Sequence, residues 1–367
     1  MIQRAYKILK HTAWLLTKGL VTKTVLVSGH LRTGETVLNC MFVAPSLFTE
    51  GVLHKLYAQQ PTVLAERRVF TPLLRSFLRK SEPGYDVCIT SLAKGYSFIV
   101  RPIATYVGQS LVNQKIDTSN GWEGVRQRLS RTNRKKTINF ESKFGLNCEI
   151  SQDPKDLGQF YHQMFLPHVR VRFGKFAVVD SFQEMRGLFS RGSFLMFVTR
   201  GGQRIAGALC RVENQRLTYY RGGVVNGDED MLECGAMTAV YYYLLDYAIK
   251  NALQELDALG SKPFLNDGVY RYKASWGAFA EPYEDQYVRT IHYICSGKSH
   301  QVASFFHALP TVIINNGSLQ MIVGHLQESL PTDAEVSAAI DLFYTSGIKS
   351  AEIIAAGGAR KCLQLPQ

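Results

Sequence analysis

A succession of apolar segments between residues 194 and 259 constrains the fold more than any other feature of this chain. Residues 194–199, 204–213 and 216–222 read as strands of a meander, separated by the Gly201-Gly202 turn and by Asn214-Gln215. Residues 236–251 then place apolar side chains at the spacing of a helix face that packs on a sheet, and residues 255–259 read as another strand. This order predicts a mixed α/β fold in which a long helix covers the sheet.

The segment that follows places a lysine among aromatic side chains. After a Gly260-Ser261 turn and an Asp267-Gly268 turn, the chain reads Tyr272-Lys273-Ala274-Ser275-Trp276-Gly277. A lysine is rarely set between aromatic residues unless its ammonium meets an anion or a developing negative charge. Lys273 is therefore a candidate functional residue, and a surface lysine on a strand is the alternative.

Together these features resemble one group of acyltransferases, the GNAT-fold enzymes of the Fem-type aminoacyltransferase and BioF-type acetyltransferase-like group. The resemblance covers about residues 120–295. In Fem-type enzymes the lysine of an aromatic-Lys-x-x-Phe-Gly motif lies near the reacting groups, and residues 272–277 match that motif with Trp276 in place of Phe. The resemblance implies a GNAT-like fold and transfer of an acyl group to an amine.

The chemistry of acyl transfer assigns roles to several residues. The reaction passes through an oxyanion, which a fixed cation such as Lys273 would stabilise. Asp257, Asp267 or Glu233 could orient the amine or take its proton. No Ser-His-Asp or Cys-His spacing supports a covalent enzyme, so we expect direct attack of an amine on a bound thioester or ester. Tyr272 and Trp276 are expected to line the substrate site.

The start of the long helix departs from the commonest pattern of the family. Acetyl-CoA-dependent GNAT enzymes hold pyrophosphate at this helix start with Gln/Arg-x-x-Gly-x-Gly/Ala, whereas here only Gly235-Ala236 match that loop. Asp228, Glu229, Asp230 and Glu233 crowd the loop and would repel phosphates. Acids also favour helix starts for structural reasons. The family favours acyl-CoA as donor, and aminoacyl-tRNA is the alternative.

Two basic segments are candidate substrate-binding regions. Residues 121–136 hold six basic residues and one acid, with Arg131 and Arg134 the expected contacts to an anionic substrate. The segment 166–174 reads as a loop carrying His168, Arg170 and Arg172, and Fem-like relatives have a similar loop near the acceptor site. A solvated linker helix and a structural histidine are the respective alternatives.

The N-terminus is a basic amphipathic segment without an acid in residues 1–34. A helix over residues 1–23 could lie on an anionic membrane or dock on the protein itself. The division expected along the chain is this helix at 1–23, a degenerate GNAT-like half at 24–120, a basic linker helix at 121–144, an acyltransferase domain at 145–295 and a helical tail at 296–367. Residues 319–327 and 348–356 read as helices of that tail, and residues 96–100 as a strand.

Composition and charge limit the classes of protein to which this chain can belong. The chain has 367 residues, 46% of them hydrophobic, and no apolar run long enough to span a membrane. Its seven cysteines are scattered without C-x-x-C spacing, which argues against a disulfide framework or zinc site and suits a reducing cytoplasm. The formal net charge of +12 would attract phosphate-rich partners such as tRNA or an anionic membrane.

The expected function is N-acyl transfer to a small or carrier-linked amine without a metal. The rival interpretation is a non-catalytic module that binds polyanions or membranes.

Overall fold

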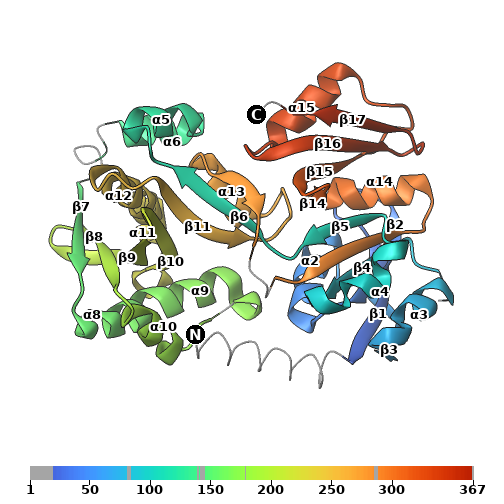
Figure 1. Ribbon diagram of the computed structural model, residues 1–367, viewed down its shortest axis with the longest axis horizontal. Helices are drawn as coiled ribbons and strands as arrows, with labels where there is room; N and C mark the ends of the chain where they lie inside the picture. The colour runs from blue at the N-terminus through green and yellow to red at the C-terminus, as the bar shows by residue number, and fades with distance from the viewer. Residues whose placement is uncertain are drawn as a thin grey trace. The chain divides into compact units, whose positions relative to one another are not determined.

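The computed structural model describes residues 20–80, 84–138, 140, 145–177, 179–284 and 288–365 (Figure 1). The chain forms two units: residues 1–112, 261–271 and 280–367 make the first, and residues 113–260 and 272–279 the second. Within the described residues, no helix has both the length and the apolar character needed to cross a membrane.

The first unit contains two sheets. The larger has the order β3-β1-β2-β4-β13-β5 and the smaller β14-β15-β16-β17. Its strands are β1 (Val21–His30), β2 (Val37–Val43), β3 (Thr62–Phe70), β4 (Val87–Leu92), β5 (Tyr106–Gln109), β13 (Thr290–Cys295), β14 (Thr311–Asn315), β15 (Ser318–His325), β16 (Ile348–Ala355) and β17 (Arg360–Gln364). Its helices are α2 (Ser46–Leu56), α3 (Leu74–Lys80), α4 (Ser97–Val100), α14 (Ser299–Ala308) and α15 (Asp333–Phe343), and the short helix η1 (Thr71–Leu73) precedes α3.

The second unit is built on a mixed sheet in which β6, β11, β10, β9, β8 and β7 are successive neighbours. These strands are β6 (Val112–Asp117), β7 (Leu146–Ser151), β8 (Ser193–Arg200), β9 (Gln203–Glu213), β10 (Arg216–Val224) and β11 (Glu255–Ser261). Its helices are α5 (Gly121–Arg128), α6 (Arg131–Thr137), α8 (Pro154–Gln159), the π-helix η4 (Phe160–Phe165), α9 (Leu166–Phe173), α10 (Phe182–Phe189), α11 (Glu229–Glu233) and α12 (Ala236–Lys250). The helix α13 (Gly268–Ser275) and the strand β12 (Phe279–Pro282) carry the chain across the division between the units.

The predicted mixed α/β class is confirmed, and so is the order of elements in the second unit. The strands β8, β9 and β10 form an antiparallel meander, α12 follows, and β11 then pairs with β10 in parallel. The apolar face of α12 packs on this sheet, with Ala239, Val240 and Leu244 fully buried. The turns that bound the apolar runs and the helical spacing of α12 distinguish strand from helix in this segment.

Other predicted elements are wrong. Residues 319–327 and 348–356 form β15 and β16 rather than helices, so the predicted helical tail at 296–367 contains a four-stranded sheet. Six consecutive residues of β15 are buried, and such a short apolar run has no periodicity that separates a strand from a helix. Residues 97–100, predicted as strand, form α4.

The predicted loop at 166–174 is also wrong, because residues 166–173 form α9. Proline normally ends a helix, but here Pro167 lies in the first turn of α9. The π-helix η4 immediately before it changes the hydrogen-bond spacing, so the missing N–H of Pro167 is tolerated. The predicted linker helix at 121–144 is interrupted at residues 129–130, where Ser130 caps the start of α6.

The expected domain boundaries also differ from the division that the structure shows. Residues 1–19 of the predicted amphipathic helix lie outside the described residues, and residues 21–23 of it belong to β1. β6 falls in the predicted 24–120 half, yet its residues 113–117 belong to the second unit. β13 falls in the predicted 145–295 domain and lies between β4 and β5 of the first unit.

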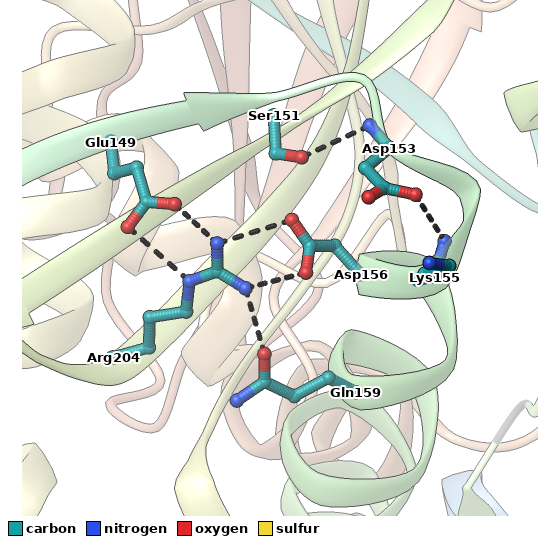
Figure 2. Close-up of polar contacts among 7 residues, drawn as sticks. All are labelled: Glu149, Ser151, Asp153, Lys155, Asp156, Gln159 and Arg204. Carbon is teal, nitrogen blue, oxygen red and sulfur yellow. Dashed lines mark hydrogen bonds and ion pairs between the residues drawn. The ribbon is translucent and has the colours of Figure 1, made fainter.

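An arginine of β9 joins the edge strand β7 to the helix α8 (Figure 2). The guanidinium of Arg204 on β9 donates to Glu149 on β7, to Asp156 at 2.8 Å and to Gln159 at 2.8 Å. It also lies 4.1 Å from the centre of the Phe197 ring. The ion pair and hydrogen bonds with Arg204 lower the pKa of the Asp156 carboxyl. This cluster stabilises the edge of the sheet on which the meander is built.

Candidate active site

The strands β10 and β11 separate partway along their length. Their parallel pairing covers only three positions, from Arg216 opposite Glu255 to Thr218 opposite Asp257. β10 then continues to Val224 and β11 to Ser261 without further mutual pairing. Because backbone N–H and C=O groups need partners, a parting of this kind offers an extended ligand a place to hydrogen-bond.

Asp257 stands at the point where the strands part. Its carboxylate accepts the Leu259 N–H at 2.8 Å and lies 3.9 Å from the guanidinium of Arg216. The residue is only 7% exposed. Burial raises the pKa of the Asp257 carboxyl, against the opposing effects of the Leu259 N–H and the charges of Lys115 and Arg216. A carboxylate with a raised pKa is a suitable proton acceptor.

Lys273 lies on α13 and reaches the end of β11. Its Nζ atom donates to the carbonyl oxygens of Leu259 at 3.0 Å and Gly260 at 3.1 Å, and the residue is only 6% exposed. The alternative of a surface lysine on a strand is therefore wrong. Leu259 itself has a φ of 60°, a left-handed conformation that leucine rarely adopts. The lysine thus fixes a positive charge beside an unusual turn of the backbone.

Aromatic side chains join α13 to the sheet and to α12. Tyr241 packs edge-on against both Tyr219 and Tyr272, and stacks on Trp276 with ring centres 5.3 Å apart. The Tyr272 hydroxyl donates to the Met237 carbonyl in the first turn of α12 at 3.2 Å. Burial raises the pKa of Tyr272 to about 12, so this hydroxyl remains a donor at neutral pH. Tyr272 and Trp276 therefore position α13, and Trp276 is fully buried.

The glycine that ends the motif is required by a close contact. Gly277 has a φ of 79°, and a Cβ at this position would lie 2.9 Å from the Arg128 side chain and 3.2 Å from the Arg128 backbone. Next to it, the Ser275 carbonyl accepts the Ser130 N–H at 2.9 Å and the Asn133 side-chain amide at 3.1 Å. The structure thus brings the start of the basic helix α6 against the lysine motif.

The two arginines predicted on that basic segment differ in their surroundings. Arg134 donates to the carbonyls of Arg126 at 2.8 Å and Gln127 at 3.0 Å, and so caps the end of α5. Arg131 is exposed, as is Lys135. Arg131 is therefore better placed than Arg134 to contact an anionic substrate.

The start of α12 holds the residues predicted to contact the acyl donor. Gly235 adopts a φ of 87° between α11 and α12, and Ala236 is fully buried. Asp228 caps α11 by accepting the Asp230 N–H at 2.9 Å, which explains one of the acids crowding this loop. Glu233 is exposed at the end of α11. A pyrophosphate at this helix start would lie close to exposed carboxylates, so these residues do not fit the usual phosphate-binding loop.

His168, Arg170 and Arg172 lie on α9. Burial, and next the charge of Arg172, lower the pKa of His168, so its imidazole is neutral at neutral pH. Arg170 and Arg172 are exposed. Helix α9 packs against β10, so all three predicted residues belong to the second unit.

Asp267 lies in the first unit and is engaged there. Its carboxylate accepts the N–H groups of Val269 at 3.0 Å and Tyr270 at 3.3 Å, and pairs with Lys55 at 3.0 Å. These contacts cap the start of α13. Two residues of the site, Leu259 and Arg216, have no signal in the sequence, since both matter through contacts that form only in the folded sheet.

No metal centre is evident in the part of the chain that the structure describes, where no group of three or more His, Cys, Asp or Glu side chains could hold an ion.

One family model and several solved structures are similar to this chain. A family model described as an acetyltransferase (GNAT) domain matches residues 125–274. No curated protein matches the chain in sequence. The chain is similar in structure to FemX, with 11% identity and a TM-score of 0.40 over 72% of this chain and 83% of that one. It is similar to the C-terminal domain (DUF2156) of a putative lysylphosphatidylglycerol synthetase from Agrobacterium fabrum, with 12% identity and a TM-score of 0.37 over 74% and 84%. It is also similar to the ribosomal-protein-S18-alanine N-acetyltransferase from Escherichia coli, with 15% identity and a TM-score of 0.26 over 41% and 94%.

Proposed function

We propose, from the premise that the chain belongs through residues 125–274 to the GNAT acetyltransferase family, that its second unit transfers an acyl group to a small or carrier-linked amine. The coarse activity, that of an N-acyltransferase, comes with the family. The finer proposal concerns the residues that carry the reaction and the donor that supplies the acyl group.

The observation that carries the proposal is the arrangement of Asp257, Leu259 and Lys273 where β10 and β11 part. A proton acceptor with a raised pKa lies two residues before a carbonyl that is held by a buried ammonium. Acyl transfer to an amine needs both kinds of group, a base for the amine proton and positive charge for the oxyanion.

The proposed reaction is a direct displacement. The amine nitrogen attacks the acyl carbonyl of the bound donor while Asp257 accepts the amine proton, directly or through a water molecule. Lys273 stabilises the negative charge that develops on the carbonyl oxygen. The bond to the carrier then breaks, and the carrier leaves with a proton. No residue of the enzyme becomes acylated.

Other predicted residues receive supporting roles. Glu233, exposed on α11, is the alternative proton acceptor, whereas the carboxylate of Asp267 is engaged as a helix cap and ion-pair partner. We assign the exposed Arg170 and Arg172 to the acceptor side, with His168 as a neutral hydrogen-bonding group beside them. Tyr272 and Trp276 hold α13 in place through Tyr241.

Acyl-CoA and aminoacyl-tRNA are the two candidate acyl donors. Acyl-CoA is the default because of the family, and Gly235 and Ala236 would then lie at its phosphates. Aminoacyl-tRNA is the second candidate, favoured by two observations: the exposed Arg131 and Lys135 lie on a helix bonded to the lysine motif, and exposed carboxylates line the approach to α12. We also retain, as a proposal, contact of residues 1–23 with an anionic membrane.

A thermal-shift titration with acetyl-CoA, free CoA and aminoacyl-tRNA distinguishes the donors. A ligand present at about 100 times its dissociation constant adds about 2.7 kcal/mol to the free energy of unfolding, which moves the midpoint by a few degrees. A shift with both CoA ligands supports acyl-CoA. A shift with charged tRNA alone, weakened in the Arg131→Ser variant, supports the second donor. No shift with any of them, under conditions where the protein is folded, contradicts the proposal.

A further inference from the structure

A groove in the first unit has the lining of a ligand site and no part in the proposed reaction. It has a volume of about 640 Å³ and lies over β1, β2 and β3, with η1 and α3 along one side. Its buried floor includes Leu26 and Met41. This volume lies within the range of pockets that hold small-molecule ligands.

The wall of the groove is apolar and unusually exposed. Phe70 and Leu73 line it with 48% and 61% of their surfaces exposed, and the partly buried Val69 and Phe77 continue the same lining. Apolar side chains gathered along one groove, rather than scattered singly, mark a surface that a ligand or partner covers.

The charged side chains that line the groove among the described residues are all positive. Arg67, Arg68 and Lys80 line it, and no Asp or Glu of the described ranges does. Among the described residues these three cations form no ion pair, and all three are exposed. An apolar floor with a cationic rim is complementary to a molecule that has an apolar tail and an anionic head.

We infer that this groove binds an anionic amphiphile, a single acyl chain that ends in a carboxylate or phosphate. The tail lies on Leu26, Met41 and Phe77, and the head meets Arg67 and Lys80. The other candidate occupant is the chain's own segment 1–19, but that segment carries Arg4, Lys7, Lys10 and Lys18 without any acid. Its charge has the same sign as the rim, which disfavours it.

The test is binding of dodecanoate to the full-length protein by isothermal titration calorimetry, below the micelle concentration. We expect saturable binding of dodecanoate and dodecyl phosphate, weaker by at least about fivefold for dodecanol and absent for acetate and inorganic phosphate. Equal affinity for dodecanol removes the role of the cationic rim and overturns the proposal.

Two variants and a matched control locate the site. Arg67→Ser/Lys80→Ser is expected to weaken dodecanoate binding about tenfold, whereas Arg200→Ser/Lys155→Ser removes the same charge from exposed positions of the second unit and should leave it unchanged. Ala65→Phe fills the groove and should abolish binding while the cations remain. Equal loss in both double variants, or unchanged binding in Ala65→Phe, overturns the assignment.

Two further measurements test the other candidate occupants of the groove, the chain's own N-terminal segment and a membrane. Binding that appears only after residues 2–19 are deleted would show that the chain's own segment fills the groove. Association with phosphatidylglycerol vesicles, without binding of monomeric dodecanoate, would show that the surface recognises a membrane instead. Either result contradicts a site for a single amphiphile. Unchanged dodecanoate binding in Lys273→Ala is expected, since the groove is independent of the proposed reaction.

Discussion

Asp257 and Lys273 hold the same residue of β11 from its two sides. The Asp257 carboxylate accepts the N–H of Leu259 at 2.8 Å, and the Lys273 ammonium donates to the carbonyl of Leu259 at 3.0 Å. Leu259 has a left-handed φ of 60°, which costs a non-glycine residue of the order of 1 kcal/mol. Two charged side chains therefore maintain a backbone conformation that leucine does not favour, at the point where β10 and β11 part.

Replacing Lys273 is expected to affect both stability and catalysis. Lys273→Ala leaves the Leu259 and Gly260 carbonyls without their donor, which should lower the free energy of unfolding by about 1–3 kcal/mol. Loss of the fixed cation should lower kcat by about 100-fold. Urea unfolding and single-turnover kinetics measure the two effects.

A second substitution separates those effects. Leu259→Gly removes the cost of the positive φ and should recover part of the stability of Lys273→Ala. Activity should not recover in the double variant. If stability and activity recover together, Lys273 serves only to position the backbone.

Asp257→Asn tests the proton acceptor. The raised pKa of Asp257 predicts that kcat/KM rises with pH through a value above the ordinary range of aspartate, and that this limb disappears in the Asn variant. Because burial disfavours the charged carboxylate, the variant should be as stable as the native chain or more stable above that pKa. An unchanged pH profile would remove Asp257 from the mechanism.

The Arg204 cluster predicts a large effect on stability. Arg204→Met leaves Glu149 and Asp156 facing each other without their partner, which should lower the free energy of unfolding by about 2–3 kcal/mol at neutral pH. Arg211→Met is the matched control, since Arg211 lies on the same strand and, among the described residues, forms an ion pair with the exposed Glu213 alone, at 2.8 Å. That control should change stability by less than about 1 kcal/mol.

The Arg204 effect has a predictable dependence on pH. Pairing with Arg204 lowers the pKa of Asp156, so the stability it contributes is present above the unfolded pKa and is lost as the pH falls through the folded pKa. The native chain and Arg204→Met should therefore converge in stability at acid pH. A difference that persists there would point to packing on Phe197 as its cause.

His292 is expected to make the first unit sensitive to acid. It is fully buried between the hydroxyls of Thr90 at 2.9 Å and Ser97 at 2.8 Å, and burial lowers its pKa to about 4. The stability gained from the neutral imidazole is present above about pH 6.5 and is lost as the pH falls through the folded value, by up to about 3 kcal/mol. Unfolding of the native chain and His292→Gln between pH 7 and about 4 checks this, and parallel curves would contradict it.

Gly277→Ala tests why the lysine motif ends in glycine. The positive φ and the contact with the Arg128 backbone should together lower the free energy of unfolding by about 2 kcal/mol. Gly145→Ala is the control for backbone conformation alone, since Gly145 has a φ of 60° and nothing within 4 Å of its Cβ position. Equal losses at the two glycines would show that the Arg128 contact is unimportant.

The meander and the helix α12 of the second unit can be predicted from sequence because turns separate the strands and the helix is long and regularly patterned. The turns at Gly201-Gly202 and Asn214-Gln215 and the helical spacing of α12 each predict one structure, and they agree with one another. By contrast, β15 and β16 are short apolar runs whose identity depends on pairing with neighbouring strands. Helix α9 could not be predicted because a proline such as Pro167 normally marks the end of a helix. The π-helical turn that accommodates Pro167 has no sequence signature.

The sequence singles out the candidate residues, whereas the contacts that join them appear only in the folded chain. The spacing of Tyr272, Lys273 and Trp276 singled out the motif, and Asp257 was among the predicted proton acceptors. The link from Asp257 through Leu259 to Lys273 depends on a left-handed leucine, which no pattern in the sequence indicates. The engagement of Asp267 and Arg134 as helix caps likewise appears only once helices α13 and α5 are in place.

The most direct test of the account is amine-dependent discharge of an acyl donor. The purified chain is incubated with acetyl-CoA or aminoacyl-tRNA and a mixture of amines, and the products are resolved by mass spectrometry. We expect a new amide on at least one amine, with discharge of the matching donor, and loss of both in Lys273→Ala and Asp257→Asn. Amide formation that is equally fast in both variants, or no amine-dependent discharge of either donor by the folded protein, would contradict it.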